Sequence, residues 1–215
     1  MPEARIEIES EDGGLDAFVA CPGGPGRRAP VILLGDRQGL TPALKTFARR
    51  LAAHGYYVLA PDWTHRPADE RREDAEAWLD HLADERGVDD TRVAAVGQGA
   101  GANLAIRLAA WRAERITAVA AYGGRGFGPV TARELAQRIN GVVHLGHALG
   151  VTPPRLGLLE AALTAAGVDF EVEIHEGEPD WGRLIDLLAR TINPVFGESG
   201  PLTSVHLTQY NSWAT

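Results

Sequence analysis

The most informative stretch of this chain is Val93-Ala94-Ala95-Val96-Gly97-Gln98-Gly99-Ala100-Gly101. Its four leading apolar residues predict a buried strand, and its glycines at alternate positions predict a tight turn. The apolar run that follows, up to Trp111, predicts a helix. A strand that turns directly into a helix is the repeating unit of parallel sheets with helices on both faces.

The rest of the chain repeats this alternation of strand and helix. Two short segments at the start predict a hairpin at a sheet edge. The whole pattern predicts an α/β fold, with a mostly parallel sheet of about seven or eight strands, helices on both faces and no large lid domain. We expect one domain over residues 1–196 and a tail over 197–215 that is disordered or docks on a neighbour. The predicted strands cover residues 5–9, 15–20, 31–34, 56–60, 91–96, 116–122, 142–145 and 168–174, and the predicted helices cover 42–54, 71–86, 100–112, 154–166 and 181–191.

Composition narrows the class of protein. The chain has 215 residues, of which 45% are hydrophobic and 23% charged, as expected of one globular domain. Its formal net charge of −8 argues against nucleic-acid binding. Cys21 is the only cysteine, so no intrachain disulfide can form. The first residues are polar and acidic, and no apolar run approaches the roughly 20 residues of a membrane span, so we expect a cytoplasmic protein.

Three stretches together resemble the dienelactone hydrolase family of α/β-hydrolases. Residues 30–41, PVILLGDRQGLT, are similar to the family's first central strand and oxyanion loop. Residues 51–62, LAAHGYYVLAPD, match its pattern L-A-x-x-G-Y-x-V-x-x-P-D. Residues 96–101, VGQGAG, stand where the family has its nucleophile elbow. The resemblance extends over residues 5–192 and implies the α/β-hydrolase fold.

The resemblance also implies that the catalytic triad is missing. The family needs a Cys or Ser at the elbow, an Asp after a later strand and a His after the last strand. The corresponding residues here are Gly99, Leu149 and Asp180. A shifted alignment cannot restore the nucleophile, because no serine occurs between Ser10 and Ser199. We therefore expect a degenerate member that cannot transfer an acyl group through this elbow.

Three residues after predicted strands are candidate catalytic groups. Asp36 is a candidate general base whose pKa burial would raise, or else a structural loop carboxylate. His147 is a candidate acid or base, or else a packed or solvated histidine. Asp180 is a candidate proton acceptor in place of the missing histidine, or else the N-cap of the last helix. His144, inside a predicted strand, is expected in the core.

Eight further residues are candidate substrate contacts, because the carboxyl ends of parallel strands meet at one edge of the sheet. The resemblance implies that the backbone N–H groups of Arg37 and Ala100 form an oxyanion hole that survives without a nucleophile. Arg125 is expected to bind an anion, the alternative being a solvated arginine. No cofactor and no metal site is predicted, since no His, Cys and carboxylate cluster has ligand spacing. The eight are Arg37, Trp63, Gln98, Gly99, Ala100, Tyr122, Arg125 and Trp181.

These features leave three hypotheses for function. The first is a repurposed enzyme that catalyses a cyclisation, isomerisation, elimination or pericyclic closure of a small biosynthetic intermediate. The second is a non-catalytic protein, either a ligand-binding module or a partner subunit. In this hypothesis the tail over 197–215 is a docking segment. The third is a metal-free hydrolase that activates water through a carboxylate. The expected partners are a small-molecule substrate and a second copy or another pathway protein.

Overall fold

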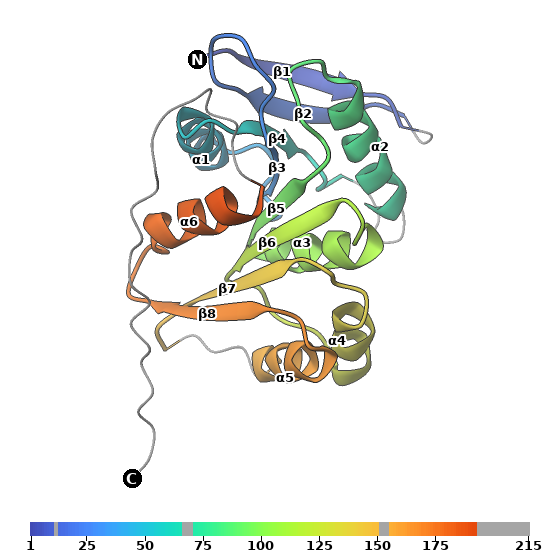
Figure 1. Ribbon diagram of the computed structural model, residues 1–215, viewed down its shortest axis with the longest axis vertical. Helices are drawn as coiled ribbons and strands as arrows, with labels where there is room; N and C mark the ends of the chain where they lie inside the picture. Colours follow the sequence, from blue (N-terminus) through green and yellow to red (C-terminus); the bar gives the residue numbers. More distant parts are fainter. Residues whose placement is uncertain (11–12, 66–70, 151–154, 193–215) are drawn as a thin grey trace.

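The computed structural model describes residues 1–10, 13–65, 71–150 and 155–192. The strands of these residues form one eight-stranded sheet (Figure 1). The strand order is β1-β2-β4-β3-β5-β6-β7-β8. β1 pairs with β2 and β2 with β4 in antiparallel fashion, and the other pairs are parallel. The predicted edge hairpin and mostly parallel sheet are confirmed. The strands are β1 (Glu3–Ile8), β2 (Leu15–Ala20), β3 (Pro30–Leu34), β4 (Tyr57–Pro61), β5 (Val93–Gln98), β6 (Ile116–Tyr122), β7 (Val142–Ala148) and β8 (Phe170–His175).

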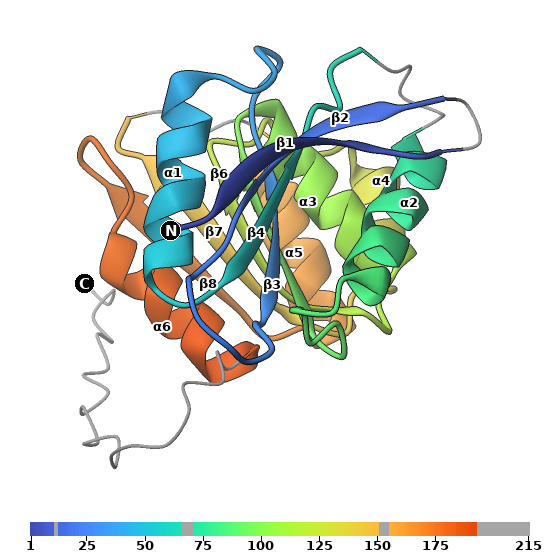
Figure 2. The same ribbon diagram turned by 90° about the horizontal axis from the view of Figure 1, so that it is seen from above.

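Helices cover both faces of the sheet, with α1 and α6 on one side and α2, α3, α4 and α5 on the other (Figure 2). Successive strand residues point to opposite faces. Ile32 therefore packs in one apolar cluster and Leu33 in the other. Both faces are buried, which explains the continuous apolar strands. The helices are α1 (Pro42–Ala53), α2 (Arg71–Asp84), α3 (Ala100–Trp111), α4 (Pro129–Ala136), α5 (Leu156–Ala166) and α6 (Trp181–Thr191).

Local signals fix the start and end of α1. The Thr41 Oγ1 accepts a hydrogen bond from the backbone N–H of Leu44 at 3.2 Å, and Pro42 occupies the first helical position. After the helix, Gly55 adopts a φ of 98°, a left-handed conformation that stops it. The chain then enters β4, so the predicted helix boundaries hold here.

The bounds of most elements differ from the prediction by one or two residues, and two differences are larger. The helix α4 was not predicted, because it follows a glycine-rich loop and spans only 8 residues. β7 continues to Ala148 rather than ending at Leu145, which places His147 inside the strand. No separate lid domain occurs among the described residues, and none of the helices described there is long and apolar enough to cross a membrane. The predicted tail over 197–215 lies outside the described residues.

Candidate active site

The turn between β5 and α3 is as tight as the alternating glycines predict. Gly99 stands directly before α3 with a φ of 57° and a ψ of −120°. A side chain at Gly97 would collide with the backbone of Gly101, and one at Gly101 would collide with the carbonyl groups of Leu34 and Gly35. The glycines therefore allow β3, β5 and α3 to approach closely. This is the backbone of a nucleophile elbow without its nucleophile.

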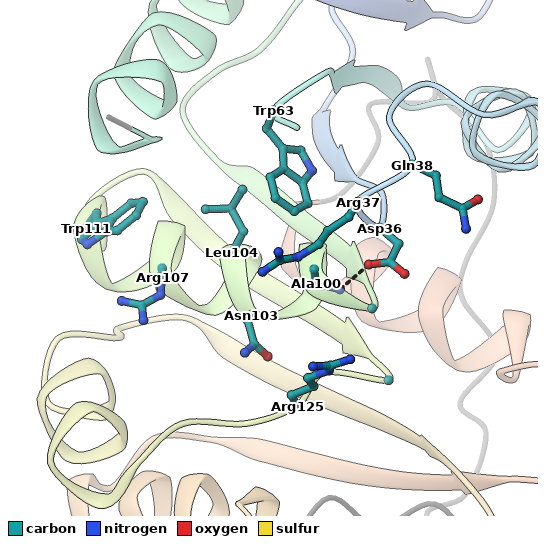
Figure 3. Close-up of a pocket in the computed structure, with 12 residues that line it drawn as sticks. Asp36, Arg37, Gln38, Trp63, Ala100, Asn103, Leu104, Arg107, Trp111 and Arg125 are labelled. Carbon is teal, nitrogen blue, oxygen red and sulfur yellow. Dashed lines mark hydrogen bonds between the residues drawn. The ribbon is translucent and has the colours of Figure 1, made fainter. Parts of the chain in front are cut away.

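The carboxylate of Asp36 lies beside Ala100 (Figure 3) and occupies the space that a nucleophile at position 99 would need. A Cβ atom built on Gly99 would lie 2.6 Å from the Asp36 Cγ. The Asp36 Oδ1 accepts a hydrogen bond from the backbone N–H of Ala100 at 2.9 Å. A side chain from the loop after β3 has thus replaced one from the elbow itself.

Asp36 also corrects two sequence-based expectations. Its pKa is lowered, not raised, because the backbone N–H groups of Ala100 and Arg37 stabilise the ionised form and outweigh the small effect of burial. These are the two N–H groups expected to form an open oxyanion hole. In this structure they are directed at Asp36, so the donors serve the protein's own carboxylate.

A cleft of about 870 Å³ opens above Gly99. The loop after β3, the helix α3 and the glycine-rich loop after β6 supply its walls. It brings together six of the predicted site residues, which are Asp36, Arg37, Trp63, Gly99, Ala100 and Arg125. Trp63 is buried, whereas Arg37 and Arg125 are exposed to the cleft (Figure 3).

The other predicted contacts line a second cleft, of about 410 Å³, on the α1 and α6 side. Gln98, Tyr122, Asp180 and Trp181 belong to it. The Asp180 Oδ1 accepts a hydrogen bond from the backbone N–H of Gly182 at 2.8 Å, so Asp180 is the N-cap of α6 as well as a lining residue. The predicted single site is therefore divided at the elbow, where Gln98 faces one cleft and Gly99 the other.

His147 lines neither cleft, contrary to its predicted place after the strand. It is 5% exposed and borders a small pocket of about 10 Å³ beside Asn103 and Phe127. Neither ring nitrogen has a hydrogen-bond partner in the part of the chain that the structure describes. Burial and the neighbouring histidines lower the pKa of His147, so its neutral form is favoured. Leu149 lies exposed beyond the end of β7.

Sequence reasoning missed one face of α3. Asn103, Arg107 and Trp111 all line the first cleft. Their spacing of four residues places them on one helical face, so the i, i+4 pattern starting at the elbow contains the signal. Arg107 is partly buried and lies 5.2 Å above the ring centre of Phe127. Because the predicted helix is mostly apolar, this face was not recognised as lining a cleft.

A network of one histidine and two glutamates lies beside the second cleft and was also missed. His144 is fully buried, as predicted, and its two ring nitrogens lie 2.9 Å from the Glu171 Oε1 and 2.9 Å from the Glu173 Oε2. The Glu173 Oε1 accepts a hydrogen bond from the backbone N–H of Asp180 at 2.6 Å. The network therefore ties β7 and β8 to the loop before α6. Alternation of glutamates along β8 is the sequence signal for it.

Comparisons with known proteins agree with this architecture. The family model described as dienelactone hydrolase family matches residues 15–82 and 63–179. A putative dienelactone hydrolase from Klebsiella pneumoniae superposes with a TM-score of 0.76 at 17% identity, over 88% of this chain and 98% of that one. A dienelactone hydrolase-like promiscuous phosphotriesterase from metagenomic libraries gives 0.71 at 25% identity, over 82% of both chains.

A more distant similarity extends to esterases. The esterase Pf2001 of Pyrococcus furiosus superposes with a TM-score of 0.72 at 16% identity, over 89% of this chain and 91% of that one, which shows the common fold. No curated protein matches the chain. The family match covers most of the chain and includes the elbow, the loop of Asp36 and the strands on either side. The chain therefore belongs to the dienelactone hydrolase family of α/β-hydrolases.

Proposed function

We propose that this chain is an enzyme that acts on a small molecule in the cleft above Gly99 without a covalent acyl intermediate. The observation that carries the proposal is the exchange of a nucleophile for a fixed carboxylate: Gly99 has no reactive atom, and Asp36 takes its place. Acyl transfer needs a nucleophile activated by a base. The Asp36 carboxylate, held in place beside an open cleft, can instead accept a proton from a molecule positioned there.

Asp36 would act as the proton acceptor. A carboxylate has about four lone-pair positions, so the hydrogen bonds from the backbone N–H groups of Ala100 and Arg37 leave capacity for a proton from the bound molecule. The electron pair of the broken bond then forms a double bond as a leaving group departs, or shifts a double bond while another atom of the substrate takes up the proton. The lowered pKa makes Asp36 a weak base, so the transferred proton must be acidified by a neighbouring group, such as a carbonyl.

Among the reactions expected from the sequence, elimination, isomerisation and base-initiated cyclisation use Asp36, whereas a pericyclic closure does not. The alternative of a non-catalytic binding protein is favoured by a separate observation. The backbone donors of Ala100 and Arg37 are already engaged by Asp36, which leaves them less able to stabilise a substrate oxyanion. Turnover separates the two functions.

Ring opening of 5-nitrobenzisoxazole, which needs only a base, tests the proposal. We expect the protein to accelerate it above buffer and Asp36→Asn to return the rate to background. The matched control is Asp180→Asn, which alters the second cleft and keeps a good helix cap; it should retain the rate. Equal rates in wild type and Asp36→Asn would favour the binding protein.

A second assay addresses hydrolysis. We expect no turnover of p-nitrophenyl acetate above background, because the elbow has no nucleophile. Saturable ester hydrolysis that disappears in Asp36→Asn would contradict the proposal and support the third hypothesis, a hydrolase that activates water through this carboxylate.

A further inference from the structure

The cleft above Gly99 is positively charged in an acidic protein. Arg37, Arg107 and Arg125 line it together with one carboxylate, Asp36, so three positive charges against one negative leave a net charge of +2. The whole chain has a formal net charge of −8. This local excess of arginine is therefore opposite in sign to the protein as a whole.

None of these three guanidinium groups forms an ion pair within the described residues, where none lies within 4.0 Å of a carboxylate oxygen, although Arg37 and Arg125 are close enough to Asp36 to help lower its pKa. Arginines elsewhere in the same residues do find partners. Arg49 contacts Glu3 at 2.7 Å, and Arg115 contacts Asp90 at 2.9 Å. The cleft thus keeps three planar donors available for a ligand.

The lack of an ion-pair partner matters most for Arg107, because this side chain is partly buried and has no counter-charge among the described residues. Burial lowers its pKa, which means that the charged form is destabilised by loss of water. The ring of Phe127, 5.2 Å from the guanidinium carbon, compensates only in part. A bound anion would supply the missing stabilisation.

The three arginines line the same cleft but come from different segments. Figure 3 shows Arg37 extending across the cleft toward Leu104 and Arg125 on the neighbouring loop, whereas Arg107 lies farther along α3 with its guanidinium group turned away from these two. Asn103 lies between Arg107 and Arg125, and its Nδ2 donates a hydrogen bond to the carbonyl of Gly126 at 3.1 Å. That bond ties α3 to the glycine-rich loop that carries Arg125. Trp63, Leu104 and Trp111 add an apolar wall.

We propose that this cleft binds an organic phosphate monoester with a compact apolar body. A phosphate monoester carries about two negative charges at neutral pH and has three acceptor oxygens, which match the net charge of the cleft and its arginine donors. A monocarboxylate would leave one positive charge unmatched. The inference rests on the proposed function in taking this cleft as the substrate site, and it names the class of substrate.

Calorimetric titration of the full chain with phenyl phosphate tests the inference, with benzoate, phenol and inorganic phosphate as comparators. We expect phenyl phosphate to bind at least about tenfold more tightly than benzoate, since charge-assisted hydrogen bonds are the strong ones. Its affinity should fall about tenfold from pH 7.5 to pH 5, because the second pKa of a phosphate monoester is about 6. Benzoate should not follow this profile. Equal affinity for the two ligands, or no heat with phenyl phosphate, would overturn the inference.

Substitutions locate the binding site. Arg37→Gln, Arg107→Gln and Arg125→Gln should each weaken phenyl phosphate binding about tenfold or more. Arg138→Gln, an exposed arginine beyond the end of α4 and outside the cleft, is the matched control and should have no effect. If Arg107→Gln fails to fold, the double variant at the exposed residues 37 and 125 still tests the site. Unchanged affinity in that double variant would refute it.

Asp36→Asn separates this inference from the proposed function. Removing the carboxylate removes the one like charge in the cleft, so phenyl phosphate should bind more tightly while base-catalysed ring opening is lost. Tight phosphate binding without turnover in the wild type would leave the inference standing and the proposed enzyme rejected. Turnover that depends on Asp36, without any phosphate binding, would reject the inference and leave the proposed enzyme standing.

Discussion

At the scale of single residues, the decisive change is a pair: Gly99 and Asp36. The sequence alone identified both positions, but it made Gly99 a candidate substrate contact, which requires room for a ligand beside the glycine. The structure places the Asp36 carboxylate in that room, because the loop after β3 and the elbow after β5 lie on adjacent strands. Neither the contact nor the direction of the Asp36 pKa follows from sequence spacing, since both depend on two segments 64 residues apart.

Gly99→Ala tests the pair directly. The left-handed φ of 57° disfavours a side chain by about 1–2 kcal/mol, and the new Cβ also collides with Asp36. We expect a lower free energy of unfolding in urea, and a smaller loss when the same change is made in an Asp36→Ala background, where the collision is absent. Additive losses, with coupling below about 0.5 kcal/mol, would contradict the contact.

The pH dependence of stability should carry the signature of Asp36. Its folded pKa lies below its unfolded value, so its contribution is present above the unfolded pKa and is lost as pH falls through the folded pKa. The stability difference between wild type and Asp36→Asn should therefore shrink from pH 5 downward, as measured by urea unfolding at each pH. A difference that grows on acidification would mean that the pKa is raised.

Replacing His147, unlike replacing Gly99, should not destabilise the protein. Its buried ring nitrogens have no partner among the described residues, so an apolar side chain of similar size removes a desolvation cost. We expect His147→Leu to leave the free energy of unfolding unchanged or higher and to retain ring opening of 5-nitrobenzisoxazole. Loss of that activity with an intact fold would restore the catalytic role predicted from the sequence.

At the scale of elements, hydrophobic patterning predicted the strands that are buried on both faces of the sheet. The central strands are apolar on both faces, so β3, β5 and β6 were found close to their observed bounds. α4 was missed because glycine and proline around residues 123–129 indicate a loop, while the helix is stabilised by packing against α5 and α3. Such tertiary contacts override local propensity and are invisible to it.

The His144 network is an element-scale device that joins β7, β8 and the loop before α6. Glu173 is buried and bonded at both oxygens, so Glu173→Gln should lower the free energy of unfolding by about 3 kcal/mol. Glu171→Gln, at a side chain that is 38% exposed, is the matched control and should cost less than about 1 kcal/mol. Equal losses in urea unfolding would mean that burial does not govern this network.

At the scale of the whole molecule, strand order decides where the cleft forms. From β3 the chain passes to β4 on one side and then to β5 on the other, so α1 and α3 depart to opposite faces. Ligands of open parallel sheets bind at such a reversal. Asp36 follows β3 and Gly99 follows β5, which is why these two residues meet there. Sequence patterns give the strands but not their order, so one predicted pocket became two clefts.

This arrangement predicts which parts of the molecule respond to a ligand. At a phenyl phosphate concentration of about 100 times its Kd, binding should add about 2.7 kcal/mol to the free energy of unfolding. Hydrogen exchange should then slow at the start of α3 and in residues 123–128, which border the first cleft, and remain unchanged at the start of α6, which borders the second. The double variant Arg37→Gln with Arg125→Gln should lose both effects, whereas Asp180→Asn should keep them. Slowed exchange confined to α6 would place the ligand in the second cleft, and the reversal of strand order would then not mark the binding site.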